Sequence, residues 1–197
     1  MPQPPSQTVG PFFHLALAPD APGVTPIAGN VLAGPQTRGE RITVEGRVLD
    51  GAGVPVDDAL IELWQANAAG RYAHPDDDRD AVALDPAFSG FGRAATGADG
   101  SFRFETVKPG RVPGRGNTLQ APHLNLVVLA RGLLSHLFTR LYFADEAEAN
   151  DEDPVLAAVD PSRRHTLLAA RDGTAQPPVY RLDIRLQGPD ETVFFDA

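Results

Sequence analysis

The stretch RITVEGRVL, residues 41–49, is the strongest fold signal in the chain because apolar and polar residues alternate along most of it. Ile42, Val44 and Val48 fall on one face of an extended chain, and charged or hydroxyl side chains fall on the other. Successive side chains of a β-strand point to opposite faces of the sheet, so a period of two predicts a strand with one buried face.

Further short strands follow this one. Apolar stretches and alternating stretches predict them at residues 60–65, 93–96, 101–106, 123–130, 137–143, 180–186 and 192–195. The sequence GADG at 97–100 separates two of them and indicates a hairpin, with glycine where positive φ is needed. Six to eight strands divided by turns predict an all-β fold, a two-sheet β-sandwich.

Helix is scarce in the sequence. Residues 145–150 predict a turn or two of helix. Asp160-Pro161 is typical of a helix N-terminus and predicts a helix through SRRHTLLAAR. Residues 107–122 are rich in proline and glycine and predict a loop.

The first forty residues differ from the rest in composition. Residues 1–40 are rich in proline, glycine and alanine and lack sustained periodicity, which predicts an extended N-terminal arm and loop. The β-sandwich domain is expected at residues 41–197. The arm contains one apolar cluster, PFFHLAL at 11–17, and such a cluster is expected to dock onto another surface.

The charge and the residue types exclude several classes of function. With 17 basic and 26 acidic residues the net charge is −9, which argues against nucleic acid and anionic membranes as partners. The absence of cysteine excludes disulfides, thiolate metal sites and cysteine nucleophiles. It fits a reducing compartment, and the N-terminal sequence MPQPPSQTVG has no signal-peptide pattern, so a cytoplasmic location is expected.

The residues alone indicate no active site. No two of the five histidines stand two or four positions apart, and no nucleophile elbow, P-loop or dinucleotide fingerprint occurs. The acidic run over residues 76–80 could bind calcium, but it lacks the glycine and glutamate of an EF-hand loop, so a solvated loop is favoured. Trp64 lies in an apolar strand, and core packing is its expected role.

A set of longer motifs adds a resemblance. The motifs are SQTVGPFFH at 6–14, LIELWQANAAGRY at 60–72, LDPAFSGFGRAATGADGSFRFETVKPG at 84–110, APHLNLVVLARG at 121–132, TRLYF at 139–143 and YRLDIRLQGPDETVFFDA at 180–197. In this order they resemble the intradiol ring-cleaving dioxygenases. The resemblance implies a β-sandwich and a ferric ion held by two tyrosines and two histidines.

The resemblance also implies that this chain has lost the iron site. Tyr72 and His123 match one ligand of each kind, whereas Val112 and Asn125 stand where the other tyrosine and histidine are expected. Gln120 stands where an arginine near the substrate ring is expected. A valine has no donor atom and an asparagine offers a neutral amide oxygen, so no metal is expected here. Tyr72 and His123 are expected to serve packing or local hydrogen bonds.

The family has a place for such a chain, as the non-iron subunit of a two-chain member. The resemblance implies a homologous β subunit as partner in higher hetero-oligomers, with Fe(III) held by that partner. The implied reaction opens 3,4-dihydroxybenzoate between its hydroxyls with O2 and gives 3-carboxy-cis,cis-muconate, an early step of the β-ketoadipate pathway. This chain would support assembly and shape the partner's pocket.

Five residues are expected to contribute to the partner's substrate pocket, and none is expected to be catalytic. Four lie in the arm and one follows a predicted strand: Thr8, Gly10, Pro11, Phe12 and Arg131. The glycine permits close approach to a ligand, and the arginine could compensate the carboxylate of the substrate. An ordinary surface ion pair is the alternative role for Arg131.

Two alternative functions remain open on the sequence. Residues 46–107 share a pattern with transthyretin-like and carboxypeptidase-regulatory-like sandwiches, which would make the chain a binding module. A self-sufficient dioxygenase with unusual ligands is the second alternative, and the iron content of the purified chain discriminates it.

Overall fold

The fold is mostly β, as the alternation predicted. The computed structural model describes Leu17 and residues 28–196, so the predicted arm residues Thr8, Gly10, Pro11 and Phe12 lie outside the described part. The strands in the described part are β1 (Arg41–Leu49), β2 (Leu60–Trp64), β3 (Phe91–Ala95), β4 (Ser101–Val107), β5 (Val112–Pro113), β6 (Leu119–Gln120), β7 (His123–Leu129), β8 (Leu137–Phe143), β9 (Leu168–Asp172), β10 (Val179–Arg181) and β11 (Ile184–Arg185).

Most strands belong to one hydrogen-bonded path, in the order β11-β1-β10-β9-β8-β7-β2-β3. β4 pairs with the other edge of β1, antiparallel from Arg41↔Val107 to Arg47↔Ser101. β9 joins the two halves of this path, because it pairs in parallel with β8 and antiparallel with β10. The short strands β5 and β6 form a separate two-stranded ribbon.

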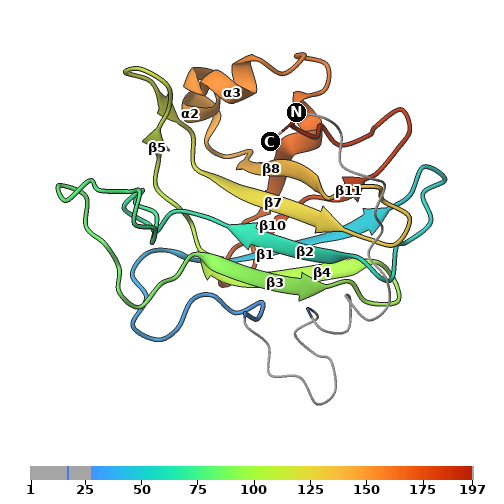
Figure 1. Ribbon diagram of the computed structural model, residues 1–197, viewed down its shortest axis with the longest axis horizontal. Helices are drawn as coiled ribbons and strands as arrows, with labels where there is room; N and C mark the ends of the chain where they lie inside the picture. The colour runs from blue at the N-terminus through green and yellow to red at the C-terminus, as the bar shows by residue number, and fades with distance from the viewer. Residues whose placement is uncertain (1–16, 18–27, 197) are drawn as a thin grey trace.

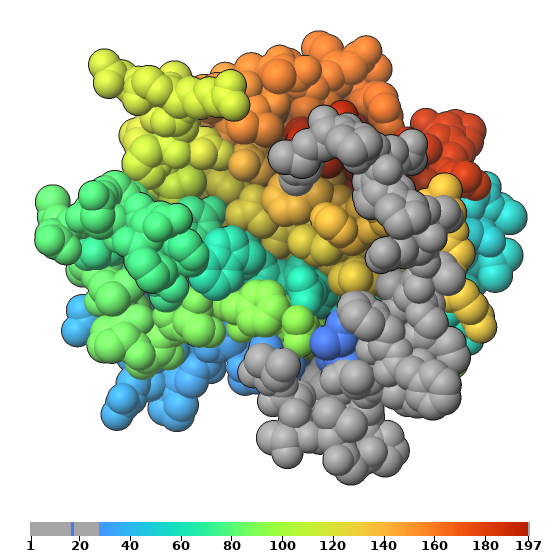
Figure 2. Space-filling view, in the orientation of Figure 1, coloured from blue at the N-terminus to red at the C-terminus, as the bar shows by residue number. Residues whose placement is uncertain are grey.

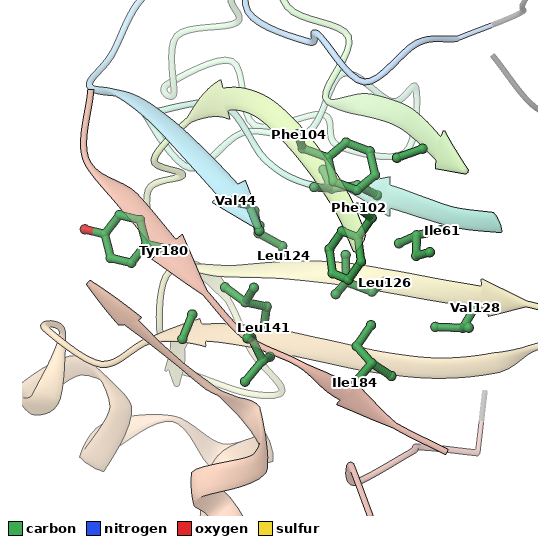
Figure 3. Close-up of a cluster of buried hydrophobic side chains, with 14 of the residues drawn as sticks. Val44, Ile61, Phe102, Phe104, Leu124, Leu126, Val128, Leu141, Tyr180 and Ile184 are labelled. Carbon is green, nitrogen blue, oxygen red and sulfur yellow. The ribbon is translucent and has the colours of Figure 1, made fainter. Parts of the chain in front are cut away.

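The core lies between the two halves of the path. Val44 of β1 and Phe104 of β4 are fully buried, and so is Leu124 of β7. Figure 3 shows these side chains, with Leu126 and Leu141, converging on the same interior. Burying apolar side chains of this size stabilises the fold by roughly 1.5–3 kcal/mol each. The face of β1 predicted to be apolar is therefore the buried one.

Short helices pack next to β6 and β8. α2 (Ala147–Glu152) and α3 (Pro154–Ala157) lie together above β8 in Figure 1, and α2 agrees with the turn of helix predicted near residue 145. Asp153 caps α3, where its carboxylate accepts hydrogen bonds from the backbone N–H groups of Val155 and Leu156. No helix in the described residues is long and apolar enough to span a membrane.

The predicted hairpin across GADG is wrong. The turn itself forms, with Gly100 at φ +74 and a hydrogen bond from the Gly97 N–H to the Ser101 carbonyl. The two flanking strands do not pair with each other, because β3 pairs with β2 and β4 pairs with β1. The glycine turn therefore connects the two halves of the sheet path.

The predicted helix after Asp160 is also wrong. Asp160 does accept a hydrogen bond from the Ser162 N–H, as an N-cap would. Only a 3-10 turn follows, η1 (Arg164–Leu167), and the chain then enters β9. Leu168 and Ala169 pair there with Tyr142 and Phe143 of β8. Sheet pairing overrides the local helix signal.

The C-terminal strands are shorter than predicted. Residues 180–186 divide into β10 and β11, and in place of a strand at 192–195 there is a single bridge between Phe195 and Phe138. Val193, Phe194 and Phe195 are partly buried against the core clusters. The loop predicted at 107–122 contains the β5–β6 ribbon.

The described part of the N-terminal segment closes the seam between the edge strands β3 and β4. The Gly29 carbonyl accepts a hydrogen bond from the Arg93 N–H, and the Asn30 carbonyl accepts one from the Glu105 N–H. Leu32 is buried in the core, where Gly92 leaves room for it. The domain boundary at residue 41 stays a prediction.

Candidate functional site

The alternation of side chains along β7 determines which of its residues face the candidate site. Leu124 and Leu126 point into the core, so His123 and Asn125 share the opposite face. On that face Asn125 stands directly beside Trp64 of β2 and Arg140 of β8 in the strand register. Three neighbouring strands therefore bring an aromatic, an amide and a guanidinium side by side.

Tyr72 reaches this face through a tight loop after β2. The Asn67 side chain accepts hydrogen bonds from the Ala69 and Arg71 N–H groups and donates to the Ala83 carbonyl. Gly70 has φ +82 and lies so close to the Arg111 carbonyl that a Cβ atom there would be 2.0 Å from that oxygen. Residues Asn67 and Gly70 thus place Tyr72 against the segment that carries Val112.

Val112 stands on the opposite side of the same cavity. It lies in β5, is buried, and pairs with Gln120 of β6. Gln120 donates to the Pro113 carbonyl and accepts a hydrogen bond from Arg140 Nη1 at 2.6 Å. Arg140 thus supplies a guanidinium close to the position where Gln120 lacks one.

The cavity has a volume of about 780 Å³. Its lining residues are Trp64, Tyr72, His74, Asp76, Asp77, Asp78, Arg79, Phe91, Val112, Pro113, Gln120, His123 and Arg140. Figure 2 shows the loop after residue 72 and the β5–β6 turn projecting on the same side of the molecule. Three of the four positions implied as degenerate ligands, Tyr72, Val112 and His123, therefore line one cavity, and Asn125 adjoins it through its hydrogen bond to Tyr72.

Tyr72 and Asn125 bind each other. Asn125 Nδ2 donates to the Tyr72 hydroxyl and to the Trp64 carbonyl, each at 3.2 Å. Burial raises the pKa of the Tyr72 phenol, so the neutral form is favoured. In this structure the Tyr72 hydroxyl thus takes part in a local hydrogen bond.

His123 is buried and neutral. Its Nδ1 lies 2.8 Å from the Ala121 carbonyl, and since a carbonyl only accepts, Nδ1 carries the proton. Burial, with a smaller contribution from the Arg140 charge, lowers the pKa of His123 to about 4. Its Nε2 is an acceptor without a hydrogen-bond partner among the described residues.

A saturated polar network lies behind the cavity. The carboxylate of Asp153 is fully buried and accepts hydrogen bonds from the N–H groups of Ala121, Val155 and Leu156. The Tyr142 hydroxyl also donates to it at 3.3 Å, and burial raises the pKa of Tyr142 to about 12. These contacts fix the segment before β7, and hence His123.

The donors present do not fit a ferric ion. Fe(III) favours anionic oxygen donors and imidazole, and this cavity offers one imidazole nitrogen and one phenol that Asn125 holds as a hydrogen-bond acceptor. Val112 has no donor atom. No cluster of three or more His, Asp or Glu side chains able to hold a metal occurs in the described part of the chain.

The acidic run forms the rim of the cavity. Asp77 binds the Arg79 guanidinium at 2.6 Å and accepts from the Tyr72 N–H, and the hydrogen bond from Arg79 lowers the pKa of Asp77 to about 2. Asp76 and Asp80 are almost fully exposed. The run therefore holds the loop after Tyr72 and otherwise faces solvent.

Arg131 does not belong to this cavity. It follows the far end of β7, and a seven-residue strand places that end about 20 Å from His123. Its guanidinium pairs with Asp58 at 3.0 Å, and its side chain is 74% exposed. Thr8, Gly10, Pro11 and Phe12 lie outside the described residues.

Two residues of the cavity escaped the sequence argument. Trp64 was expected in the core, but it points away from Leu63 and is half-buried against Tyr72, with ring centroids 5.8 Å apart. Arg140 alternates with buried Thr139 and Leu141 within TRLYF, and this alternation is the signal that could have placed it on the outer face.

The fold and this cavity define a protein of the intradiol dioxygenase class. The family model described as Dioxygenase matches residues 18–188, and the chain belongs to this family. The dioxygenase domain of a carbohydrate-binding fusion protein from Streptomyces sp. SirexAA-E has a similar structure. Its TM-score is 0.62 at 29% identity, covering 93% of this chain and 97% of that domain.

Curated relatives narrow the similarity further. The protocatechuate 3,4-dioxygenase α chain of Burkholderia cepacia is 48% identical over 200 residues, covering 99% of this chain and 98% of the relative. The β chain from the same organism is 40% identical over 176 residues, covering 83% and 71%. Similarity to the α chain is thus higher and extends over more of both sequences.

Proposed function

We propose that this chain is the α chain of a protocatechuate 3,4-dioxygenase and acts in a hetero-oligomer with a homologous β chain. Its similarity to an α chain over nearly the full length of both sequences supports this assignment. The family match over residues 18–188 extends far beyond residues 46–107, so the binding-module alternative is not favoured. We assign the fold as a two-layered sandwich and the location as the cytoplasm.

The iron of the complex, on this proposal, is Fe(III) held by the β chain. The observation that carries this is the occupancy of two ligand positions: Val112 has no donor, and Asn125 donates its amide to Tyr72. Ring opening of 3,4-dihydroxybenzoate with O2, to 3-carboxy-cis,cis-muconate, takes place at the partner's iron. The present chain supports assembly and shapes that pocket.

The contribution to the partner's pocket comes from the arm and from Arg131. The arm residues are Thr8, Gly10, Pro11 and Phe12, with backbone N–H groups near the glycine as donors. The exposed guanidinium of Arg131 supports its assignment, since it is held by one carboxylate and is available to a partner. A substrate carboxylate in a dry pocket requires such compensation.

Iron analysis tests the proposal. The chain is purified alone and after co-expression with a β-type chain, and iron per chain is measured with the visible absorption of tyrosinate bound to Fe(III). We expect iron and the absorption band in the complex, and neither at stoichiometric level in the chain alone. About one iron per isolated chain, with that band, contradicts the proposal and supports the self-sufficient dioxygenase.

Light scattering tests the assembly. Interfaces of permanent complexes are large and apolar, so the chain alone should be poorly soluble and should be rescued by the β-type chain. A well-behaved monomer that does not change in the presence of that partner argues against a hetero-oligomer.

A further inference from the structure

Arg140 is a half-buried cation without a carboxylate partner. Its Nη1 donates to Gln120 Oε1 at 2.6 Å and to the Tyr142 hydroxyl at 3.2 Å, and no ion pair to it exists among the described residues. The nearby carboxylate of Asp153 is occupied by three backbone N–H groups and Tyr142. A guanidinium in this situation favours an incoming anion, above all a planar carboxylate.

His123 adds an unsatisfied acceptor to the same cavity. Its Nε2 is buried and has no partner in the part of the chain that the structure describes, while Nδ1 donates to the Ala121 carbonyl. Leaving such a nitrogen unpaired carries a desolvation penalty. A hydroxyl group donated to Nε2 would remove this cost.

The walls between these two polar groups are aromatic. Trp64 and Tyr72 stack with an interplanar angle of 15°, and the Phe91 ring lies 6.3 Å from that of Trp64. The Tyr72 hydroxyl accepts from Asn125, and its own proton has no acceptor among the described residues. A volume of about 780 Å³ lies within the usual range of small-molecule sites.

The rim carries charge of the opposite sign. Asp77 is neutralised by Arg79, whereas Asp76 and Asp78 are exposed and face solvent. Exposed carboxylates are screened over about 8 Å at physiological ionic strength, so they weaken the attraction of Arg140 for an anion without cancelling it.

We propose that this cavity binds, without a metal ion, a small aromatic carboxylate that bears a ring hydroxyl. The carboxylate pairs with Arg140, the ring packs against Trp64 and Phe91, and the hydroxyl donates to His123 Nε2. This second aromatic-acid site belongs to the present chain and is separate from the pocket proposed for the partner.

The sole tryptophan gives a direct readout, because Trp64 lines the cavity. The full chain is titrated with the ortho, meta and para hydroxybenzoates while Trp64 fluorescence is followed. We expect saturable binding of at least one isomer, weaker binding of benzoate and of phenol, and none of cyclohexanecarboxylate. Saturation with none of the isomers overturns the proposal, and benzoate binding as tightly as every isomer overturns the role of His123.

Arg140→Gln should weaken binding of the best isomer roughly 10- to 150-fold, the range for a lost charge-assisted hydrogen bond. Arg115→Gln is the matched control, since this exposed arginine lies outside the cavity and its loss changes the net charge equally. Equal effects of the two variants overturn the assignment of Arg140. Asp78→Asn, at the exposed rim, should tighten binding, and this variant decides the question if Arg140→Gln does not fold.

The same site can be counted in the assembled complex. Equilibrium dialysis with the best isomer should find two aromatic-acid sites per pair of chains, and Arg140→Gln should remove one of them. A single site that Arg140→Gln leaves intact contradicts the inference. The fluorescence titration does not involve the partner, so its outcome is independent of the proposed hetero-oligomer.

Discussion

Two sides of one residue, Ala121, show opposite ways of burying a polar group. On one side the Ala121 N–H donates to Asp153 at 2.7 Å, and every oxygen of that carboxylate has donors. On the other side the Ala121 carbonyl accepts from His123, whose remaining nitrogen has no partner within Leu17 and residues 28–196. Both groups are almost completely buried.

The buried Asp153 carboxylate has a structural role, whereas the buried His123 nitrogen indicates a binding site. A saturated network such as that of Asp153 rigidifies the structure and needs nothing further. Buried polar groups without partners are rare, and each one requires an explanation. Around His123 this nitrogen coincides with a cavity, aromatic walls and Arg140, which has no ion pair among the described residues, and the proposed ligand would account for it.

The largest loss of stability is expected when the hydrogen-bonded carboxylate of Asp153 is removed. Asp153→Ala removes the acceptor of three backbone N–H groups and of Tyr142, and should lower the free energy of unfolding by about 3–5 kcal/mol. Urea denaturation measures this. Asp160→Ala, which removes an exposed aspartate bound to Ser162, is the control and should cost much less. Equal losses in the two variants would show that the buried contacts of Asp153 stabilise the fold no more than those of an exposed aspartate.

The buried His123 should make the stability of the fold depend on pH. Burial lowers the pKa of His123 to about 4, against about 6.5 in an unfolded chain. Between these values the unfolded chain binds more protons, so the free energy of unfolding should fall by about 3 kcal/mol as the pH decreases from about 6.5 to about 4.

Denaturation across this pH range measures the effect of His123, and His123→Asn should flatten the slope. His165→Gln is the control, because His165 is exposed, and it should leave the slope in place. An unchanged slope in His123→Asn would show that another group is responsible.

Arg131, which follows the far end of β7, can be tested by enzyme kinetics. If Arg131 serves the partner's pocket as proposed, Arg131→Ala in the assembled complex should raise the KM for protocatechuate roughly 10- to 150-fold. The effect on catechol, which has no carboxylate, should be much smaller. Steady-state kinetics on complexes of verified iron content measure both, with Asp58→Asn as the control for the ion pair. Equal losses for the two substrates would assign Arg131 to assembly.

The smallest effect is expected at Tyr72. Tyr72→Phe removes a hydroxyl whose bond to Asn125 is replaceable, since Asn125 Nδ2 still donates to the Trp64 carbonyl. The free energy of unfolding should change by about 1 kcal/mol or less, and the iron content of the complex should not change. A loss of iron in this variant would show that Tyr72 acts as a ligand, against the proposed function.

The sequence predicted the mostly β fold and several strands closely, because these strands carry their own signal. The alternation at residues 41–49 corresponds to β1, and the apolar stretch at 137–143 corresponds to β8. In β1 the alternation marks the buried face, and in β8 the apolar composition marks the strand, so neither strand needs a distant contact to be recognised.

The motifs also indicated which residues would meet. Tyr72, Val112 and His123 are far apart in the sequence and line one cavity in the structure, and Asn125 binds the Tyr72 hydroxyl. This grouping came from the resemblance, because no spacing between them is local. The roles of Thr8, Gly10, Pro11, Phe12 and Arg131 stay predictions.

The sequence alone thus establishes the strand-rich fold, the acidic net charge without thiol chemistry, and a valine and an asparagine at residues 112 and 125, where the resemblance implies a tyrosine and a histidine. Only the tertiary structure decided that β3 and β4 do not pair, that the segment after Asp160 becomes β9, and that Arg140 enters the cavity. These outcomes depend on competition between distant partners. A strand pairs with the neighbour that satisfies its backbone hydrogen bonds, whatever the local sequence favours. The strand register then determines which cavity a charged side chain lines.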